Sequence, residues 1–178
     1  MVRASGVSLI ELLTVMTIVA ILLAVGVPSF RYVTNANRIA AEANGLLGDL
    51  QFARVEAIKE GLTVTACISS DGATCSGAAS GRWQNGWIVF SDLQNDQTVD
   101  AGDTVLRVQK PFTSSDTFTA AGATSAVTFN REGFATGLPN GTQITLHDST
   151  TSSAWTRCLS ITLIGLMAVQ QYDGSTCT

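Results

Sequence analysis

The amino-acid sequence predicts an α+β protein in which one long N-terminal helix carries an antiparallel β-sheet on its second half. Three observations predict this fold class. An apolar run opens the chain, a helical pattern of apolar residues continues directly from it, and after Gly61 the pattern changes to short strands separated by turns. A chain of 178 residues is also long enough to bury one core.

The apolar run extends from Val7 to Val27 and contains one charged residue, Glu11. A helix of this length rises about 30 Å, which is close to the hydrocarbon thickness of a bilayer. We therefore predict that residues 7–27 span a membrane. Arg3 precedes the run, and this positive charge predicts a cytoplasmic N-terminus with everything after Pro28 outside. An ordinary secretory signal would have a shorter apolar run, followed by a small-residue cleavage site.

A carboxylate within a membrane helix costs a few kcal/mol unless it has a partner. Glu11 is either tolerated near the lipid headgroups or paired with a positive charge at the same depth. A free α-amino group would serve as that partner if cleavage after Gly6 made Val7 the new N-terminus. Glu11 would then be the fifth residue of the mature chain.

The residues around this junction, GVSLIELL from Gly6 onward, resemble the class III prepilin signal. In that family a short basic leader ends in glycine, and a membrane prepilin peptidase cuts after it and methylates the new amine. The resemblance implies a leader of residues 1–6, cleavage between Gly6 and Val7, N-methylation of Val7, and a role for Glu11 in subunit docking. Pro28 falls at mature position 22, where pilin helices commonly have a kinking proline. Val7 stands where most members have phenylalanine.

From residue 28 to residue 60 the pattern predicts an amphipathic continuation of the helix, with one apolar stripe at steps of three and four. The stripe consists of Val33, Ala36, Ala40, Ala43, Leu47, Leu50, Ala53 and Ala57. Because the stripe is rich in small residues, we expect it to pack on the sheet and not to lie on a membrane. The whole helix is predicted from Ser8 to Glu60, and Gly61 is a natural stop.

Residues 61–178 are predicted to form an extracytoplasmic β domain. Runs of β-branched and aromatic residues alternate with Gly, Asn, Asp and Ser turns. The expected strands are Leu62–Ile68, Gly86–Ser91, Thr104–Gln109, Ala126–Asn130, Gln143–His147, Arg157–Thr162 and Leu166–Gln171. The segments Ser69–Ser80 and Thr113–Ser125 are expected to be long loops.

Three further stretches resemble the GspH/FimT group of type IV pilin-like proteins. They are Asp49–Ile58, the pair Trp87–Asp92 and Gly102–Arg107, and Phe129–Ala135. The resemblance implies a type IV pilin fold. This group contains minor pilins of type IV pili, such as FimT and FimU, and GspH-like minor pseudopilins of type II secretion. Its members are scarce in the filament and lie at or near its tip.

The four cysteines, Cys67, Cys75, Cys158 and Cys177, suggest two disulfides if the chain is exported. Three pairings are possible. We favour Cys67–Cys75 and Cys158–Cys177, because each closes a local loop and the second would hold the C-terminus. Their spacing is not that of C-x-x-C zinc pairs.

Catalytic or metal chemistry has little support in the sequence. The one histidine, His147, lies beside Asp148 without an accompanying nucleophile signature, so we predict no enzyme and no cofactor. Carboxylates cluster between Asp92 and Asp103, in a pattern that could bind calcium. Their spacing is not that of an EF-hand, however, and such loops are ordinary hairpin connections, so no metal site is predicted.

Two other candidate surfaces are weak. Arg82, Trp83, Trp87 and Trp155 could form an aromatic surface, but tryptophans in a small domain more often lie in the core. Some FimT relatives bind DNA through a Gly-Arg-x-Arg segment. The corresponding stretch here, Ile164–Val169, keeps Gly165 but has Leu166 and Ala168 in place of the arginines.

The charge balance also disfavours nucleic acid. From residue 61 onward nine acidic residues face five basic ones, which gives no bulk attraction for phosphates. The leading interpretation is a minor pilin that joins an initiating complex and comes to lie near the tip of a type IV pilus. The alternatives are a minor pseudopilin of type II secretion and a DNA-binding minor pilin for natural transformation.

The resemblance also implies the partners and the location. The partners would be other pilins or pseudopilins, the prepilin peptidase and inner-membrane lipid, with no small-molecule substrate. The precursor would cross the bacterial inner membrane once with its N-terminus inside. The mature subunit would then enter a pilus or pseudopilus.

Overall fold

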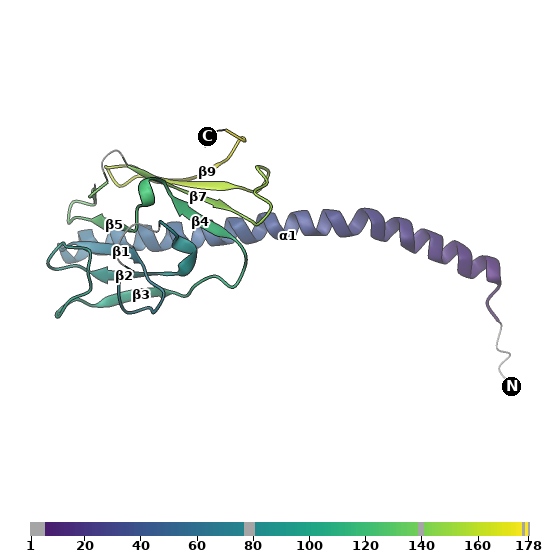
Figure 1. Cartoon of the computed structure of the whole chain (residues 1–178), viewed down its shortest axis with the longest axis horizontal. Helices are drawn as coiled ribbons and strands as arrows, with labels where there is room; N and C mark the ends of the chain where they lie inside the picture. Colours follow the sequence, from purple (N-terminus) through teal and green to yellow (C-terminus); the bar gives the residue numbers. More distant parts are fainter. Residues whose placement is uncertain (1–5, 77–80, 139–140, 176, 178) are drawn as a thin grey trace. The chain divides into compact units, whose positions relative to one another are not determined.

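The computed structural model describes residues 6–76, 81–138, 141–175 and 177. They form two compact units, residues 1–37 and residues 38–178. Helix α1, Leu9–Glu60, makes up almost all of the first unit and continues into the second (Figure 1). This range agrees with the predicted helix to within one residue. Most of the predicted leader, residues 1–5 with Arg3, lies outside the described residues.

The part of α1 that belongs to the second unit buries one stripe of side chains against the β domain. The fully buried residues are Ile39, Ala43, Leu46, Leu50, Ala53 and Ala57. The predicted stripe was wrong at Val33, which is exposed, and at Ala36 and Ala40, which are only half-buried. Leu47 is half-buried and packs against the core. Alanines occur on both sides of the buried stripe. The spacing of the apolar residues therefore does not show which of two neighbouring stripes faces the β domain. The β domain covers the stripe that offers the larger Ile39 and Leu46.

The strands are antiparallel, as the predicted fold class requires, and they divide between two sheets, a division that the sequence did not show. The five-stranded sheet has the order β3-β2-β1-β5-β6, and the four-stranded sheet has the order β4-β7-β8-β9. The strands are β1 Val64–Ile68, β2 Trp87–Ser91, β3 Val105–Gln109, β4 Thr117–Ala120, β5 Ala126–Phe129, β6 Ala135–Thr136, β7 Thr142–His147, β8 Arg157–Ile161 and β9 Met167–Gln171. The seven predicted strands all exist, with ends that differ by one or two residues.

The predicted loop Thr113–Ser125 contains strand β4 and the short 3-10 helix η2, Ala121–Ala123. In β4 the side chains of Phe118 and Ala120 are buried, and the residues between and before them are not. This alternation is too short to stand out among the surrounding Ser, Thr, Ala and Gly residues. Antiparallel pairing with β7 holds this segment as a strand, although its local sequence does not predict one. The two-residue β6 was missed because it is too short to show a period.

One core contains buried side chains of α1 and of both sheets. A chain of aromatic rings crosses it. Trp83, from the 3-10 helix η1 (Trp83–Asn85), lies 6.4 Å from Trp87 of β2 between ring centroids. Trp87 lies 5.8 Å from Phe112, and Phe112 lies 4.8 Å from Phe118 of β4. These tilted and edge contacts link the five-stranded sheet to the four-stranded one through the face that α1 covers.

Two disulfides close local segments of the β domain. Cys67 of β1 is bonded to Cys75 across eight positions, and Cys158 of β8 to Cys177 across nineteen positions. The structure therefore has the pairing that we favour among the three possible ones. No cysteine in the described chain is left free. The second bond holds the C-terminal segment against β8.

We predict that replacing Cys158 and Cys177 together by serine lowers the free energy of unfolding by about 2–4 kcal/mol, because the bond removes loop entropy from the unfolded chain. Urea unfolding of the oxidised full-length protein in detergent, compared with the double variant, measures the loss. Peptide mapping without reduction checks the pairing. Peptides that join Cys67 to Cys158 or to Cys177 would contradict it.

Candidate functional site

The first unit contains the apolar segment of α1, which is the candidate membrane-spanning surface. α1 contains an apolar segment near the N-terminus that is long enough to cross a membrane, and none of this segment is buried inside the structure. Its hydroxyl groups are satisfied within the helix, since Thr14 donates to the carbonyl of Glu11 at 2.9 Å and Thr17 to that of Leu13 at 2.8 Å. Satisfied hydroxyls suit a helix in lipid, where no water can replace a missing bond.

Glu11 lies in the first turn of α1 and is exposed. It lines a shallow depression on the helix surface together with the apolar Val7, Leu12, Val15 and Met16. Gly6 and Val7 precede the helix and are exposed, so the predicted cleavage site is accessible in this structure. Glu11 is the one charged side chain among the described residues that line this depression.

Pro28 lies inside α1, and the helix continues on both sides of it. Proline has no N–H, so the carbonyl of Ala24 receives no helical hydrogen bond from this position. Gly26 is two residues away, and a Cβ there would meet nothing within 4 Å. The helix therefore lacks one backbone hydrogen bond at Pro28.

Arg38 and Glu42 bind α1 to the chain before β4, and sequence reasoning missed this cluster. The Arg38 guanidinium makes two bonds to the buried carboxylate of Asp116, Nε to Oδ2 at 2.5 Å and Nη2 to Oδ1 at 2.8 Å. Glu42 lies one turn further along the helix. Its Oε1 accepts a bond of 3.5 Å from Ser114, and its Oε2 is buried with no hydrogen-bond partner among the described residues. A single arginine thus faces two carboxylates here.

Burial raises the pKa of Glu42 from its ordinary value of 4.5 to about 7, and the negative charge of Asp116 raises it further in the same direction. The pKa of Arg38 is raised by its hydrogen bonds to Asp116. A proton on Glu42 therefore removes one of the two negative charges that meet at this cluster. Sequence spacing gave no sign of this, because Arg38 and Asp116 are 78 positions apart.

The carboxylates of the loop between β2 and β3 stabilise the loop by accepting hydrogen bonds from its own backbone. Asp92 is fully buried and accepts bonds from the Thr65 hydroxyl and from the backbone N–H groups of Asp96 and Gln97. Asp103 accepts backbone bonds from Leu93 and Asp100. Among the described residues, acidic, histidine and cysteine side chains form no group of three or more that could hold a metal ion.

His147 and the tryptophans have structural partners. The His147 ring lies 3.1 Å from the Thr117 hydroxyl on the neighbouring strand. Trp83 and Trp87 are buried, and the Trp87 indole donates to Asp49 of α1 at 2.9 Å. Asp49 also accepts a bond of 2.7 Å from Arg107, whose guanidinium covers the Phe52 ring. Trp83 and Trp87 therefore lie in the core, as the sequence favoured, and do not form an aromatic surface with Arg82.

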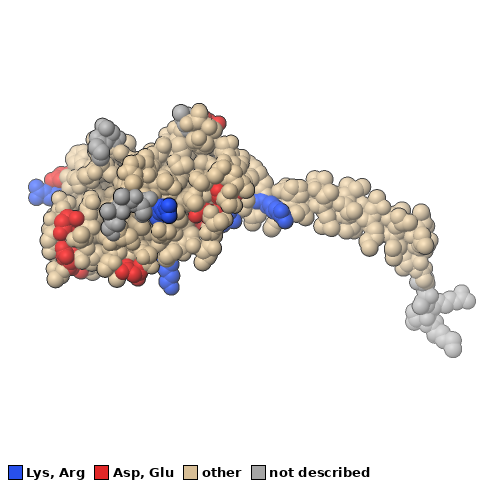
Figure 2. Space-filling view, in the orientation of Figure 1, with Lys and Arg blue, Asp and Glu red and all other residues tan. Residues whose placement is uncertain are grey.

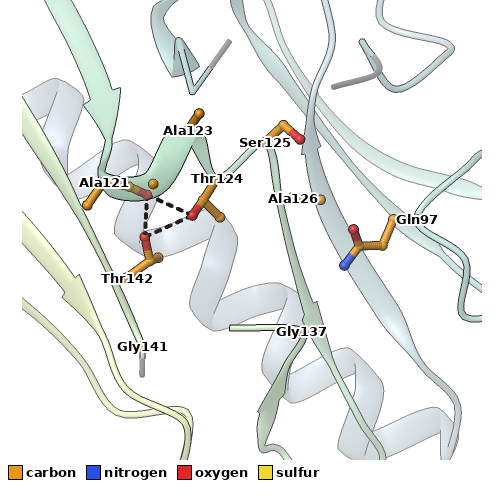
Figure 3. Close-up of a pocket in the computed structure, with 10 residues that line it drawn as sticks. Gln97, Ala121, Ala123, Thr124, Ser125, Ala126, Gly137, Gly141 and Thr142 are labelled. Atoms are coloured by element: carbon orange, nitrogen blue, oxygen red, sulfur yellow. Dashed lines mark hydrogen bonds between the residues drawn. The ribbon is translucent and has the colours of Figure 1, made fainter. Parts of the chain in front are cut away.

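A pocket of about 440 Å³ lies beside η2, at the start of β5 and β7. The hydroxyls of Thr124 and Thr142 meet there at 3.2 Å, and both donate to the carbonyl of Ala121 (Figure 3). Gln97 and several small residues complete the described lining, which includes no ionisable side chain. The hydroxyls of Thr124 and Thr142 are thus used within the fold.

The basic side chains of the β domain mostly have partners as well. Arg131 pairs with Glu132 at 2.8 Å, and Arg157 donates to backbone carbonyls near its own strand. The segment that corresponds to the DNA-binding motif of some relatives begins in the β8–β9 turn, and Leu166 there is exposed. This end of the domain presents aliphatic side chains where arginines would be needed.

Comparison with known families and structures identifies relatives. The family model described as "Type II transport protein GspH" matches residues 42–165. The comparison with curated proteins gives no match.

Two crystal forms of the type IV minor pilin FimU from Pseudomonas aeruginosa are similar in structure. The first has a TM-score of 0.60 and 21% sequence identity, and the similarity covers 82% of this chain and 96% of FimU. The second has a TM-score of 0.57 at 20% identity, over 80% and 96% of the two chains. The minor pseudopilin EpsH of the Vibrio cholerae type 2 secretion system has a TM-score of 0.46 at 11% identity, over 74% and 95%. The similarity to FimU confirms the type IV pilin fold.

The buried Glu42 predicts that stability depends on pH. Because the pKa of Glu42 is higher in the folded chain than its ordinary 4.5, the folded state binds more protons between about pH 4.5 and 7. Its contribution is present below pH 4.5 and is lost as the pH rises through 7. Glu42→Gln should therefore be more stable than the natural chain at pH 8, by on the order of 1 kcal/mol after allowance for solvent screening.

Thermal unfolding at pH 5 and pH 8 measures this effect, with Glu60→Gln as the matched control on an exposed position of the same helix. We expect the difference between Glu42→Gln and the natural chain to grow with pH, and the control to show no such growth. Equal differences at both pH values would show that Glu42 carries its charge as easily in the folded chain as in the unfolded one.

Proposed function

Because the chain belongs to the GspH family of minor pilins and pseudopilins, we propose that it is a minor pilin. In this proposal it joins a membrane-anchored initiating complex and comes to lie near the tip of a type IV pilus. Its role is structural: it is an assembly subunit and not an enzyme.

The observation that carries the proposal is the unburied apolar segment of α1 next to a fully formed β domain. The β domain completes its core without this segment, because the buried residues of α1 begin at Ile39. A long exposed apolar surface has to be covered by something else. A bilayer covers it in the precursor, and the helices of neighbouring subunits cover it in a filament.

The proposed division of the chain follows from the same helix. Residues 1–6 are the leader, residues 7–27 the membrane span, residues 28–60 the amphipathic continuation, and residues 61–178 the extracytoplasmic domain. The precursor crosses the inner membrane once, with its N-terminus in the cytoplasm. Both disulfides lie in the part that this orientation exports, and such bonds persist in an oxidising compartment.

Glu11 gives the proposal its docking mechanism. An exposed carboxylate on an apolar helix surface is costly in lipid, and the cost falls when a positive charge reaches it. Cleavage after Gly6 would create an α-amino group on Val7 of each subunit. Pairing of that amine with Glu11 of a neighbouring subunit would remove two unpaired charges from the bilayer at once, and would also set the depth at which the two helices meet.

A minor pseudopilin of type II secretion is the second candidate, and the description of the matching family favours it. The leader, the span and Glu11 would work in the same way in both machines. Crosslinking in the native cells, followed by identification of the partners as pilins or as secretion pseudopilins, separates the two.

We predict that Gly6→Val leaves the precursor uncleaved in the inner membrane, because the peptidase would need the glycine at its cut. Intact-mass measurement of the membrane fraction checks this, with Ala4→Val as the control within the leader. The prediction fails if the Gly6→Val chain is found with Val7 at its N-terminus.

We predict that Glu11→Ala is cleaved normally but enters filaments at least about tenfold less often, since loss of a charge pair in lipid removes a few kcal/mol of docking energy. The measurement compares the amount of subunit in sheared filaments with the amount in membranes. Ser8→Ala is the control on the same turn. Incorporation at the natural level would mean that Glu11 is merely tolerated.

A further inference from the structure

Large hydrophobic side chains are exposed at the end of the β domain where α1 stops. Among the described residues of 38–178, every exposed large hydrophobic except Val108 lies at this end, each between 42% and 60% exposed. Val55, Ile58 and Leu62 come from the last turns of α1 and the residues just after it. We call this surface the apolar pole.

The sheets bring two more of these side chains to the apolar pole. Leu93 follows β2, and the backbone of Asp92 donates to Thr63 at 2.9 Å, which places Leu93 next to the end of the helix. Phe134 lies in the turn after β5, and in that turn Gly133 packs against Ile58. The apolar pole therefore combines a helix end with two loops.

The β8–β9 turn adds Leu163, Ile164 and Leu166, and its shape is fixed. Thr162 and Leu166 are joined by a backbone bond of 2.9 Å, and the Leu163 carbonyl accepts another from Ala135 of β6. Arg54 of α1 donates to the carbonyls of Gly133 at 3.0 Å and Ile164 at 3.4 Å. Turns usually consist of polar residues, so three aliphatic side chains held outward on a hydrogen-bonded turn indicate a contact surface.

A groove of about 370 Å³ enters the apolar pole between the helix end and β2 and β3. Leu62, Leu93 and Leu106 line it, and Glu56 and Glu60 stand at its side. Lys59 pairs with both carboxylates, at 2.9 Å and 3.1 Å, which leaves one negative charge in excess. A lysine or arginine from a partner could lay its methylene stem on the leucines and bring its charge to Glu56 and Glu60.

The rim of the apolar pole is acidic beyond the groove. The loop from Leu93 to Asp103 contains three exposed or half-exposed aspartates and no base. Arg131, in the turn before Phe134, is offset by its partner Glu132. Figure 2 shows acidic side chains along the left-hand edge of the domain, where Figure 1 places the end of α1.

We propose that the apolar pole is the docking surface for another protein subunit, whose contact segment combines aliphatic side chains with lysine or arginine. The proposal rests on the proposed function, since it names the surface by which this subunit holds a neighbour. An apolar centre with a charged rim is the usual anatomy of a protein interface, and complementary charge sets which partner fits.

The charge of the rim argues against the other occupants. A bilayer surface with anionic lipids would repel the aspartates and glutamates. A second copy that met the apolar pole with its own pole would bring two acidic rims together, which is unfavourable. A protein with a basic rim has neither cost.

A photo-crosslinking amino acid at Leu93 or at Ile164 of the full-length chain, expressed in its native cells, tests the proposal. Val108 is the matched control, because it is also exposed but lies away from the apolar pole. We expect both pole positions to attach to one identified protein, at a peptide that contains lysine or arginine beside aliphatic residues. The control should not attach to that protein.

Charge reversal adds the second measurement. Glu60→Lys together with Asp100→Lys should lower the crosslink yield at Ile164 about tenfold, because like charges would then meet in the interface. Asp173→Lys, near the C-terminus and beyond the opposite end of β9, should leave the yield unchanged. Lysine in the last turn of a helix is favourable, so the fold tolerates the change at position 60.

Several outcomes would overturn the proposal. They are adducts with a second copy of this chain, adducts with lipid, a partner peptide without a base, a yield that the lysines do not change, and pole yields no higher than that at Val108. Filament incorporation is measured in parallel in the same cells. If the chain enters filaments without the pole crosslink, only this proposal fails. A pole crosslink in a chain that never enters filaments contradicts the proposed function instead.

Discussion

The buried stripe of α1 is the constraint on which the rest of the β domain depends. In the described residues the two sheets share no strand, so no ladder of backbone hydrogen bonds joins them. Each sheet has an apolar face that has to be buried, and the same stripe of the helix lies in the core with both. Small residues on the stripe, such as Ala43 and Ala53, let backbones approach closely, and Leu46 and Leu50 fill the space between them.

Polar side chains of the helix fix its position along the sheets at three levels. Near the start of the second unit Arg38 binds Asp116, in the middle Asp49 binds Trp87 and Arg107, and near the end Arg54 binds the two turns that carry Gly133 and Ile164. Apolar packing alone permits a helix to slide or rotate by a residue at small cost. Directional bonds at three levels oppose such shifts. They therefore fix a single position of α1 along the sheets, which the apolar core alone would not do.

Much of the fold could be predicted because it is local. Hydrophobic periodicity predicted the helix to within one residue and seven of the nine strands in the described residues, and the loop lengths suggested the disulfide pairing that the structure has. The features that could not be predicted depend on contacts between residues far apart in the sequence. Whether Ile39 or Ala40 faces the core depends on the sheets. Strand β4 depends on β7, and the cluster of Arg38, Glu42 and Asp116 depends on a contact across 78 positions.

The candidate functional surfaces also differ in how far the sequence could predict them. Gly6, Val7 and Glu11 could be singled out from the sequence because a lone charge in an apolar run is visible without a structure. The apolar pole could not, because its side chains come from four separate segments, and each looks ordinary by itself. A single exposed leucine needs no explanation, but eight exposed hydrophobics at one end of a domain do.

Two apolar surfaces are exposed in the part of the chain that the structure describes, and their charges differ. The helix surface around Glu11 has almost no charge, which suits lipid and other helices. The apolar pole has an acidic rim that disfavours both lipid and its own copy, and therefore requires a different protein. A subunit of this kind is complete only within an assembly, because the two surfaces need different partners and its own core can bury neither.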